Sequence, residues 1–189
     1  MAVSPLITSG PASGRPDPGE AMAETMMFIP RSVRFVLAIA IVVTIGCDRV
    51  TKHVATTTLA GTAGHSFLGD TVRLQYAENT GGFLGLGADL HPGLRMALFT
   101  ASTGVMLVLM TVAAVRWQVG GAALFGVTLF VAGGASNWID RLARGSVVDF
   151  LNLGVGPVRT GIFNVADVAI MAGAAVMLIA ELRAARRSP

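Results

Sequence analysis

Four long apolar stretches constrain the fold of this chain more than any other feature of its sequence. They occupy residues 33–45 with its continuation, 94–115, 119–138 and 162–182. A helix needs about 20 predominantly apolar residues to cross the hydrocarbon core of a bilayer. Charged residues make up only 13% of the chain, too few to coat a soluble surface, where about 25% is usual. The sequence therefore predicts an all-α integral membrane protein with four transmembrane helices.

The regions outside these stretches differ in character. Residues 1–30 are rich in Pro, Gly, Ser and Ala, which predicts a disordered N-terminal tail followed by a four-span membrane domain over residues 31–189. Between the first two spans, residues 58–92 alternate polar and apolar side chains and are dense in glycine. That pattern predicts a small extracytoplasmic β-hairpin or sheet element at the membrane surface. Residues 147–151 are predicted to be another short extended piece.

Several classes of function have little support. Cys47 is the only cysteine, so neither an intramolecular disulfide nor a thiol-based metal cage can form. The three histidines, His53, His65 and His91, make no His-Glu-x-x-His motif, which argues against a zinc protease. The basic residues are scattered rather than gathered on one stripe, so we expect no nucleic-acid partner.

Four aspartates stand at the ends of the apolar stretches: Asp48, Asp140, Asp149 and Asp167. An ionisable residue at membrane depth costs about 2.5 to 3.5 kcal/mol, so each is a candidate functional residue. If successive spans alternate in direction, the four meet at one membrane face. Two neighbouring carboxylates do not both ionise cheaply, so one keeps a proton while the other acts as a base. Such a pair hydrolyses peptides without a metal.

Simpler interpretations of these residues stay open at this point. Asp167 is also placed to be a helix N-terminal carboxylate stabilised by the helix dipole. Lys52, the only lysine, is a candidate base for a serine nucleophile, but it is also four residues from Asp48, the spacing of a helical ion pair. The serines available to it are Ser66, Ser102 and Ser136.

Two further features concern the third span and the orientation of the chain. The small residues 133–136 favour close helix packing, and Asn137 and Arg141, one turn apart, present an amide and a guanidinium on one face. An even number of spans puts both termini on one side. The distribution of Lys and Arg between the two sides does not decide which side is cytoplasmic.

Five segments, in this order, resemble the lipoprotein signal peptidase (signal peptidase II) family of bacterial membrane aspartyl proteases. They cover the chain from the first span to the fourth, and together they are far more specific than any one alone. The segments are Asp48-Arg49-Val50-Thr51-Lys52, Asn79-Thr80-Gly81, Gly133-Gly134-Ala135-Ser136-Asn137-Trp138-Ile139-Asp140-Arg141, Val147-Val148-Asp149-Phe150 and Phe163-Asn164-Val165-Ala166-Asp167.

The resemblance divides the four aspartates. It implies that Asp149 and Asp167 are the catalytic pair and that Asp140 is a supporting residue. It further implies that Asn79 and Arg141 contact the substrate backbone. Asn137 and Asn164 would orient the pair, and Asp48 with Lys52 would hold the first helix.

The same resemblance implies a reaction, a partner and a location. The family cuts a prolipoprotein just before a cysteine that carries a diacylglyceryl group, and it needs no metal or organic cofactor. We therefore expect a monomeric enzyme of the bacterial cytoplasmic (inner) membrane, in contact with membrane lipid. Both termini would be cytoplasmic and the active site would lie near the extracytoplasmic face. One departure from the family is the Gly81-Gly82-Phe83-Leu84 segment, where Gly-x-Ala-Phe is usual.

Two other classes of function compete with this one. Arg31, Arg34 and the apolar run that ends at Cys47 are similar to a lipoprotein signal peptide, although three more spans follow. A transporter or channel subunit would use its intramembrane aspartates to relay protons.

Overall fold

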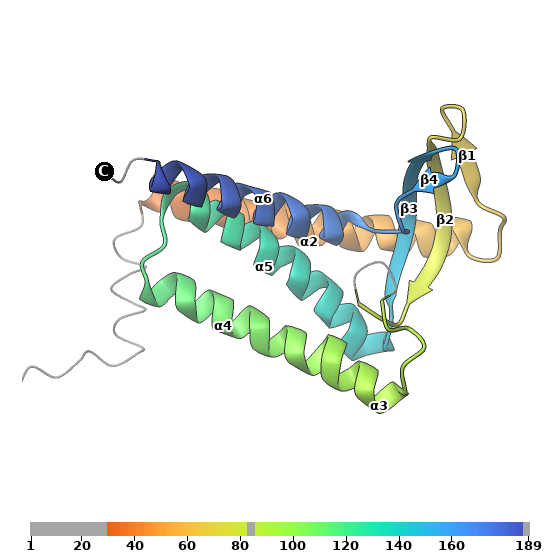
Figure 1. Cartoon of the computed structure of the whole chain (residues 1–189), viewed down its shortest axis with the longest axis horizontal. Coiled ribbons are helices and arrows are strands. Elements are labelled where there is room, and N and C mark those ends of the chain that lie inside the picture. The colour runs from red at the N-terminus through yellow and green to blue at the C-terminus, as the bar shows by residue number, and fades with distance from the viewer. Residues whose placement is uncertain (1–29, 83–85, 187–189) are drawn as a thin grey trace, which may run out of the picture.

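The computed structural model describes residues 30–82 and 86–186. The disordered tail predicted for residues 1–30 therefore lies outside the described residues, apart from its last one. Within the described residues the chain is mostly helical, and a small antiparallel sheet closes one end of the helices (Figure 1).

Three helices are long and apolar enough to cross a membrane among the residues described. The first is the continuous helix Pro92–Arg116, made of α3 (Pro92–Arg95), the π-helical turn η2 (Met96–Ala101) and α4 (Ser102–Arg116). The second is α5 (Gly121–Arg144) and the third is α6 (Val165–Ala185). All three coincide with predicted spans.

The fourth helix, α2 (Arg31–Leu59), is the longest, with 29 residues. It does not stop after the apolar run but continues through Asp48 and Lys52. Its last turns pack on the sheet, where Ala55, Leu59 and Val148 form a buried cluster. A membrane-spanning role for α2 stays a prediction.

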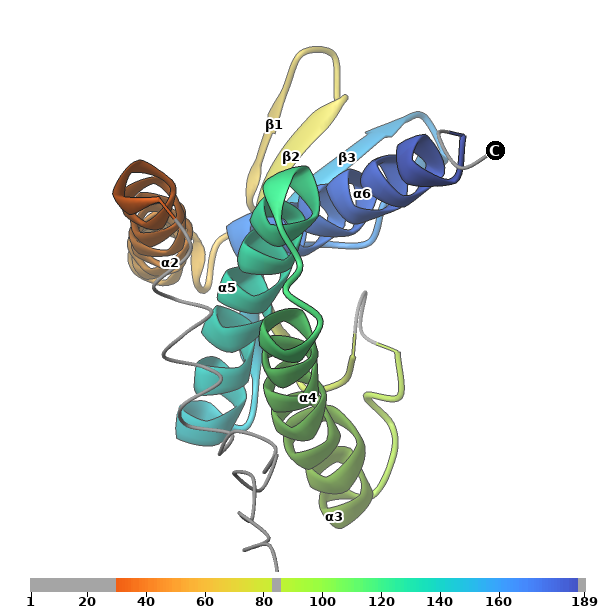
Figure 2. The same cartoon turned by 90° about the vertical axis from the view of Figure 1, so that its left-hand side faces the viewer.

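The helices run alternately toward and away from the sheet, with α5 between α2, α4 and α6 (Figure 2). α5 and α6 approach closely because glycines line their contact: a Cβ on Gly126 would lie 2.8 Å from the Gly173 carbonyl oxygen, and one on Gly133 would lie 2.5 Å from that of Ala166. Small residues at a helix contact permit this approach, as predicted for residues 133–136.

The ends of two helices differ from their predicted positions for local reasons. α6 begins at Val165, three residues later than predicted, because Asn164 is its N-cap in a capping box with Asp167. α5 runs six residues past its predicted end, to Arg144, where Gly145 adopts the left-handed conformation (φ 73°) that commonly ends a helix.

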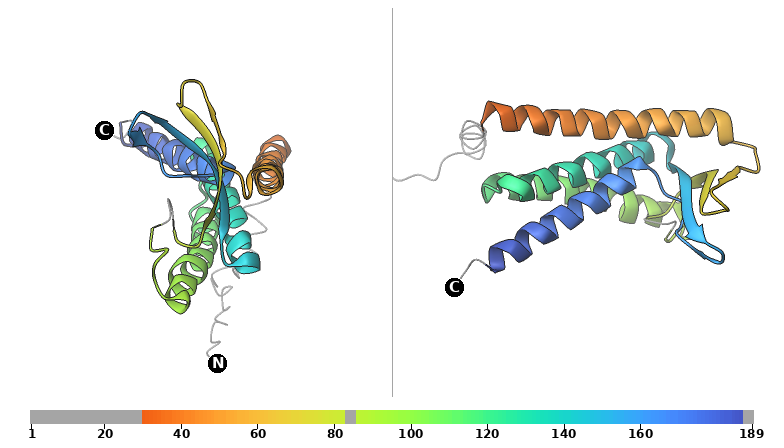
Figure 3. Two further views of the ribbon diagram at one scale, coloured as in Figure 1. Left: turned by 90° about the vertical axis from the view of Figure 1, so that its right-hand side faces the viewer. Right: turned by 90° about the horizontal axis from the view of Figure 1, so that it is seen from above.

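The sheet contains four antiparallel strands in the order β1 (His65–Phe67), β2 (Val72–Asn79), β3 (Val147–Val155) and β4 (Val158–Arg159). The hairpin predicted between the first two spans is present as β1 and β2. The prediction was too narrow, however, because β3 and β4 come from the segment between α5 and α6. An unpaired strand edge needs partners for its N–H and C=O groups, and β3 supplies them to β2. The sheet lies across the ends of the helices (Figure 3).

Candidate active site

Asp149 lies on β3 at the junction between the sheet and the helices. It stands opposite Ala77 of β2 and is only 2% exposed. Both of its carboxylate oxygens accept a hydrogen bond from an amide. Asn79 Nδ2 donates to Oδ2 at 3.0 Å and Asn164 Nδ2 donates to Oδ1 at 2.6 Å. Donors on both oxygens fix the orientation of this carboxylate.

Asp167 lies in the first turn of α6. Its Oδ2 accepts the backbone N–H of Asn164 at 3.1 Å, while Asn164 Oδ1 accepts the backbone N–H of Asp167 at 2.9 Å. The interpretation of Asp167 as a helix N-terminal carboxylate is thus correct as far as capping goes. Capping uses only Oδ2, however. The other oxygen, Oδ1, accepts a hydrogen bond from Asn137 Nδ2 at 2.9 Å.

Asn164 connects the two carboxylates. Its backbone N–H bonds Asp167, and its Nδ2 donates to Asp149 and, at 3.2 Å, to Asn137 Oδ1. Asn137 Oδ1 also accepts from Lys52 Nζ at 2.8 Å. Because its oxygen faces an ammonium group, the Nδ2 of Asn137 is the end that faces Asp167.

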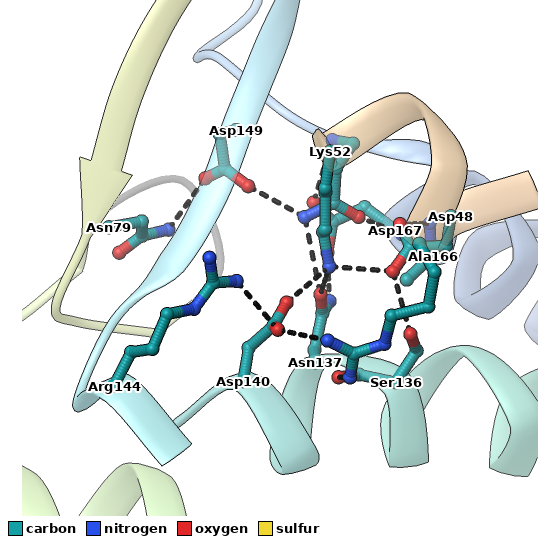
Figure 4. A network of polar contacts seen from close by, with 12 residues as sticks. Asp48, Lys52, Asn79, Ser136, Asn137, Asp140, Arg144, Asp149, Ala166 and Asp167 are labelled. Carbon is teal, nitrogen blue, oxygen red and sulfur yellow. Dashed lines mark hydrogen bonds and ion pairs between the residues drawn. The ribbon is translucent and has the colours of Figure 1, made fainter. Parts of the chain in front are cut away.

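Lys52 is buried, and its side chain ends among Asn137, Asp140 and Asp48 (Figure 4). Its Nζ is 2.7 Å from Asp48 Oδ2 and 2.8 Å from Asp140 Oδ2, and it donates to Asn137. The helical ion pair with Asp48 that the spacing predicts is therefore present. Lys52 Nζ thus donates to Asn137 and Asp140 and lies in an ion pair with Asp48, which argues against its use as the base of a serine nucleophile.

Asp48 ties α2 to the two neighbouring helices. Its Oδ2 accepts from Ser136 Oγ at 2.7 Å and its Oδ1 accepts from the backbone N–H of Ala166 at 2.9 Å. The Ser136 hydroxyl group therefore donates its hydrogen bond to a carboxylate. This argues against its use as a nucleophile with Lys52 as the base. The contact at Ala166 also fixes the first turn of α6, one residue before Asp167.

Asp140 is surrounded by cations. Besides Lys52, its carboxylate accepts from Arg49 Nη1 at 2.5 Å and from Arg144 Nη2 at 2.7 Å. A carboxylate that is buried and paired three times is a structural anchor. Arg49 lies in one of the segments that resemble the family, but the sequence predicted no partner for it or for Arg144, although the four-residue spacing from Asp140 to Arg144 is that of a helical ion pair.

Arg141 points toward the loop that follows β2. Its Nη2 donates to the Gly81 carbonyl oxygen at 2.7 Å, and its Nε is buried without a partner in the described part of the chain. A buried, unpaired N–H donor is costly unless another group satisfies it. Within the described residues Arg141 thus has one N–H donor without a partner, and the charges of Asp167 and Asp149 lie near enough to act on its guanidinium group.

Burial is the main reason that the pKa of Asp149 is raised to about 6, and the nearby charge of Asp167 raises it further. The hydrogen bonds from Asn79 and Asn164 act in the opposite direction because they favour the ionised form. A carboxyl group with this pKa exchanges its proton near neutral pH, as a general acid or base must.

The structure brings all nine predicted site residues to one end of the helices, with Asp149 and Asp167 linked through asparagine amides. Lys52 lies next to them and is paired with both Asp48 and Asp140 (Figure 4). Over residues 30–82 and 86–186, no three His, Cys, Asp or Glu side chains are grouped so as to hold a metal ion.

The family model of Signal peptidase (SPase) II matches residues 39–183 of the chain. The chain belongs to the signal peptidase II family. The resemblance seen in the sequence is thereby confirmed, as is the enzyme class, an aspartic-type signal peptidase. The alternative classes of transporter subunit and lipoprotein precursor are set aside.

Curated relatives and solved structures agree with this assignment. The lipoprotein signal peptidase of Mycobacterium tuberculosis is 30% identical over 96% of this chain and 88% of its own length. That of Mycobacterium leprae is 32% identical over 92% and 83%. Two solved structures of bacterial membrane enzymes superpose with TM-scores of 0.71 and 0.68. Their sequence identities are 24% and 25%, and they cover 82% and 78% of this chain and 92% of each solved chain. The fold is therefore that of a bacterial membrane enzyme.

Proposed function

We propose that Asp149 and Asp167 are the catalytic pair of a peptidase that cuts prolipoproteins just before a diacylglyceryl-modified cysteine. Membership of the signal peptidase II family supports the removal of signal peptides from prolipoproteins. The observation that carries the assignment of the pair is the bridge through Asn164, which hydrogen-bonds both carboxylates. The other two aspartates of the site, Asp48 and Asp140, are fully buried and are held in ion pairs with Lys52.

The chemistry follows from one proton shared by two carboxyl groups. The ionised member takes a proton from a water molecule, whose oxygen attacks the scissile carbonyl carbon, while the protonated member donates to the carbonyl oxygen. The tetrahedral intermediate then collapses: one of its hydroxyl groups returns a proton to the ionised member, the C–N bond breaks, and the leaving amine takes a proton from the protonated member, so that the pair again holds one proton. The pair titrates as a coupled unit, and the pKa of Asp149 near 6 keeps one proton available close to neutral pH.

The remaining residues would act by placing the substrate and the pair. Asn137 and Asn164 orient the two carboxylates through the bonds described above. The unpaired Nε of Arg141 is a donor suited to a substrate carbonyl, and Asn79 lies beside Asp149 where the peptide backbone would pass. Asp48 and Lys52 hold α2 against α5 and α6.

We further propose that α2 is a fourth transmembrane helix and that both termini are cytoplasmic. α2 begins and α6 ends at one end of the bundle, and the sheet lies at the other (Figure 1). The pair belongs to the sheet end, because Asp149 is on β3 and Asp167 is in the first turn of α6. The pair would then be near the extracytoplasmic face of the bacterial inner membrane. There the acyl chains of a lipidated substrate stay in the bilayer while water reaches the bond. We expect the enzyme to act as a monomer.

The test is processing of a diacylglyceryl-modified prolipoprotein by purified Asp149→Asn and Asp167→Asn proteins in detergent. Each variant keeps the size of the side chain but removes its proton chemistry, so each should abolish cleavage while membrane insertion and folding persist. Asp70→Asn is the matched control, because Asp70 is a partly exposed aspartate of the sheet region, paired with Arg73, and this variant should cleave normally. Cleavage retained by either catalytic variant would refute the assignment.

A further inference from the structure

The short segment Asn79–Gly82, directly after β2, borders the carboxylate pair. The side chain of Asn79 is tied to this segment as well as to Asp149. Its Oδ1 accepts the Gly81 N–H at 3.0 Å, and its Nδ2 donates to the Gly82 carbonyl at 2.9 Å. The same Nδ2 donates to Asp149. The Asn79 amide therefore stays oriented toward the Asp149 carboxylate only while the backbone of residues 79–82 keeps its conformation.

Two arginines from different helices hold that backbone. Arg141 of α5 bonds the Gly81 carbonyl. Arg95, the last residue of α3, bonds the residue before it: its Nη1 donates to Thr80 Oγ1 at 2.7 Å and to the Ala88 carbonyl at 3.0 Å. Arg95 thus joins the beginning of the segment to the chain that returns toward α3.

A second contact comes from Phe99, one helical turn beyond Arg95. Its ring lies against two glycines: a Cβ on Gly82 would be 2.8 Å from Phe99 Cε1, and one on Gly87 would be 2.8 Å from Cζ. The π-helical turn that carries Phe99 is itself fixed to α5, because Trp138 Nε1 donates to the Thr100 carbonyl at 2.8 Å. Phe99, which packs against this segment, is therefore held in place by α5, the helix that carries Asn137.

We infer that Arg95 is a positioning residue of the active site, which holds Thr80 and Ala88 so that the Asn79 amide stays directed at Asp149. The inference rests on the proposed function, since it is Asp149 whose orientation matters. Arg95 bonds neither carboxylate of the pair and acts through the chain of contacts from Thr80 to Asn79. A lysine would not replace it fully, because a guanidinium offers several donors in a fixed plane and an ammonium group does not.

Loss of this support changes one hydrogen bond at Asp149. The charged groups that face Asp149 are Lys52 of α2, Arg141 of α5 and Asp167 of α6, and none of them is altered when Arg95 is replaced. The hydrogen bond from Asn79 favours the ionised form of Asp149, so its loss raises the pKa of that carboxyl group. We expect the acidic limb of the pH profile to move upward by about half a unit or more.

The experiment compares Arg95→Gln, Thr80→Val and the double variant with wild type in detergent. The carboxyl carbon of Asp149 is titrated by NMR in protein labelled at aspartate, without substrate, and its resonance is assigned from its absence in Asp149→Asn. Each single variant should raise the midpoint of this titration and lower kcat/KM by about tenfold, the equivalent of one hydrogen bond. The double variant should be no worse than either single variant. Thr80→Ser should retain the wild-type values, since it keeps the hydroxyl group.

Arg116→Gln is the matched control, since it removes the same charge from the exposed far end of the same helix, and it should change neither the titration nor kcat/KM. An unchanged Asp149 titration in both Arg95→Gln and Thr80→Val would overturn the inference, as would additive effects in the double variant. If Arg95→Gln does not fold, Thr80→Val alone decides the question. Because the titration needs no substrate, a negative result here is distinct from failure of the catalytic assignment, which the Asp149→Asn cleavage assay detects.

Discussion

Asn164 does two separable things, and substitutions at this position tell them apart. It caps α6 with its side-chain oxygen, and its Nδ2 bridges to Asp149. Alanine removes both interactions. Serine is about as good an N-cap as asparagine but is too short to reach Asp149, so it restores the cap without the bridge.

The expected magnitudes follow from these contacts. Loss of the cap costs about 1 kcal/mol, and loss of a hydrogen bond to a charged group costs about 1.5 to 3 kcal/mol. Asn164→Ala should therefore lower the free energy of unfolding by about 2.5 to 4 kcal/mol, and Asn164→Ser by about 1 kcal/mol less. Activity should not follow this order. Both variants should lose about 100-fold in kcat/KM, because small displacements of catalytic groups cost that much.

The assay is cleavage of a diacylglyceryl-modified peptide, measured beside thermal unfolding in the same detergent. The acidic limb of the pH profile should also shift upward in both variants, because the lost hydrogen bond favours the ionised form of Asp149. An Asn164→Ser enzyme with wild-type activity would refute the bridging role. Equal stability of the serine and alanine variants would refute the capping role.

Three further predictions concern the fold around the pair. Because the pKa of Asp149 is raised from its ordinary value of 3.8 to about 6, the native state binds more protons than the unfolded state between these values. Stability should therefore fall by up to about 3 kcal/mol as pH rises from 4 to 7, a slope that unfolding measurements should not find in Asp149→Asn. Asp140→Asn leaves three cations near a neutral side chain and should destabilise the protein by about 3 to 5 kcal/mol, whereas Asp70→Asn, at a partly exposed ion pair with Arg73, should lower the unfolding temperature much less. Normal stability of Asp140→Asn would mean that its ion pairs contribute nothing. Gly133→Ala places a Cβ 2.5 Å from a carbonyl oxygen of α6 and should lower both the unfolding temperature and activity, while Gly46→Ala, with nothing within 4 Å, should do neither.

Much of the site could be predicted because many of its residues are identified by short sequence spacings or by motifs. The spacing of Asp48 and Lys52 predicts their ion pair, and the apolar blocks predict the helices. Asn164 and Asp167, three residues apart, also carry the pattern of a capping box, which explains why α6 begins at Val165 and not three residues earlier.

Other features depend on long-range contacts that no local pattern contains. The pairing of β2 with β3 joins residues about 70 to 80 positions apart, so residues 147–151 were predicted only as a short extended piece and not as part of the same sheet. Arg49 pairs with Asp140 across 91 positions. The continuation of α2 to Leu59 depends on packing against the sheet, where tertiary burial outweighs the charges that interrupt the apolar run.

The most direct test of the catalytic pair compares Asp149→Asn, Asp167→Asn and the double variant in one cleavage assay with a lipidated prolipoprotein. Two groups that share one proton act as a unit, so their effects are not additive. The account predicts that each single variant is as inactive as the double variant, and that all three remain folded in the membrane. Substantial cleavage by either single variant, or a double variant much slower than both, would contradict it.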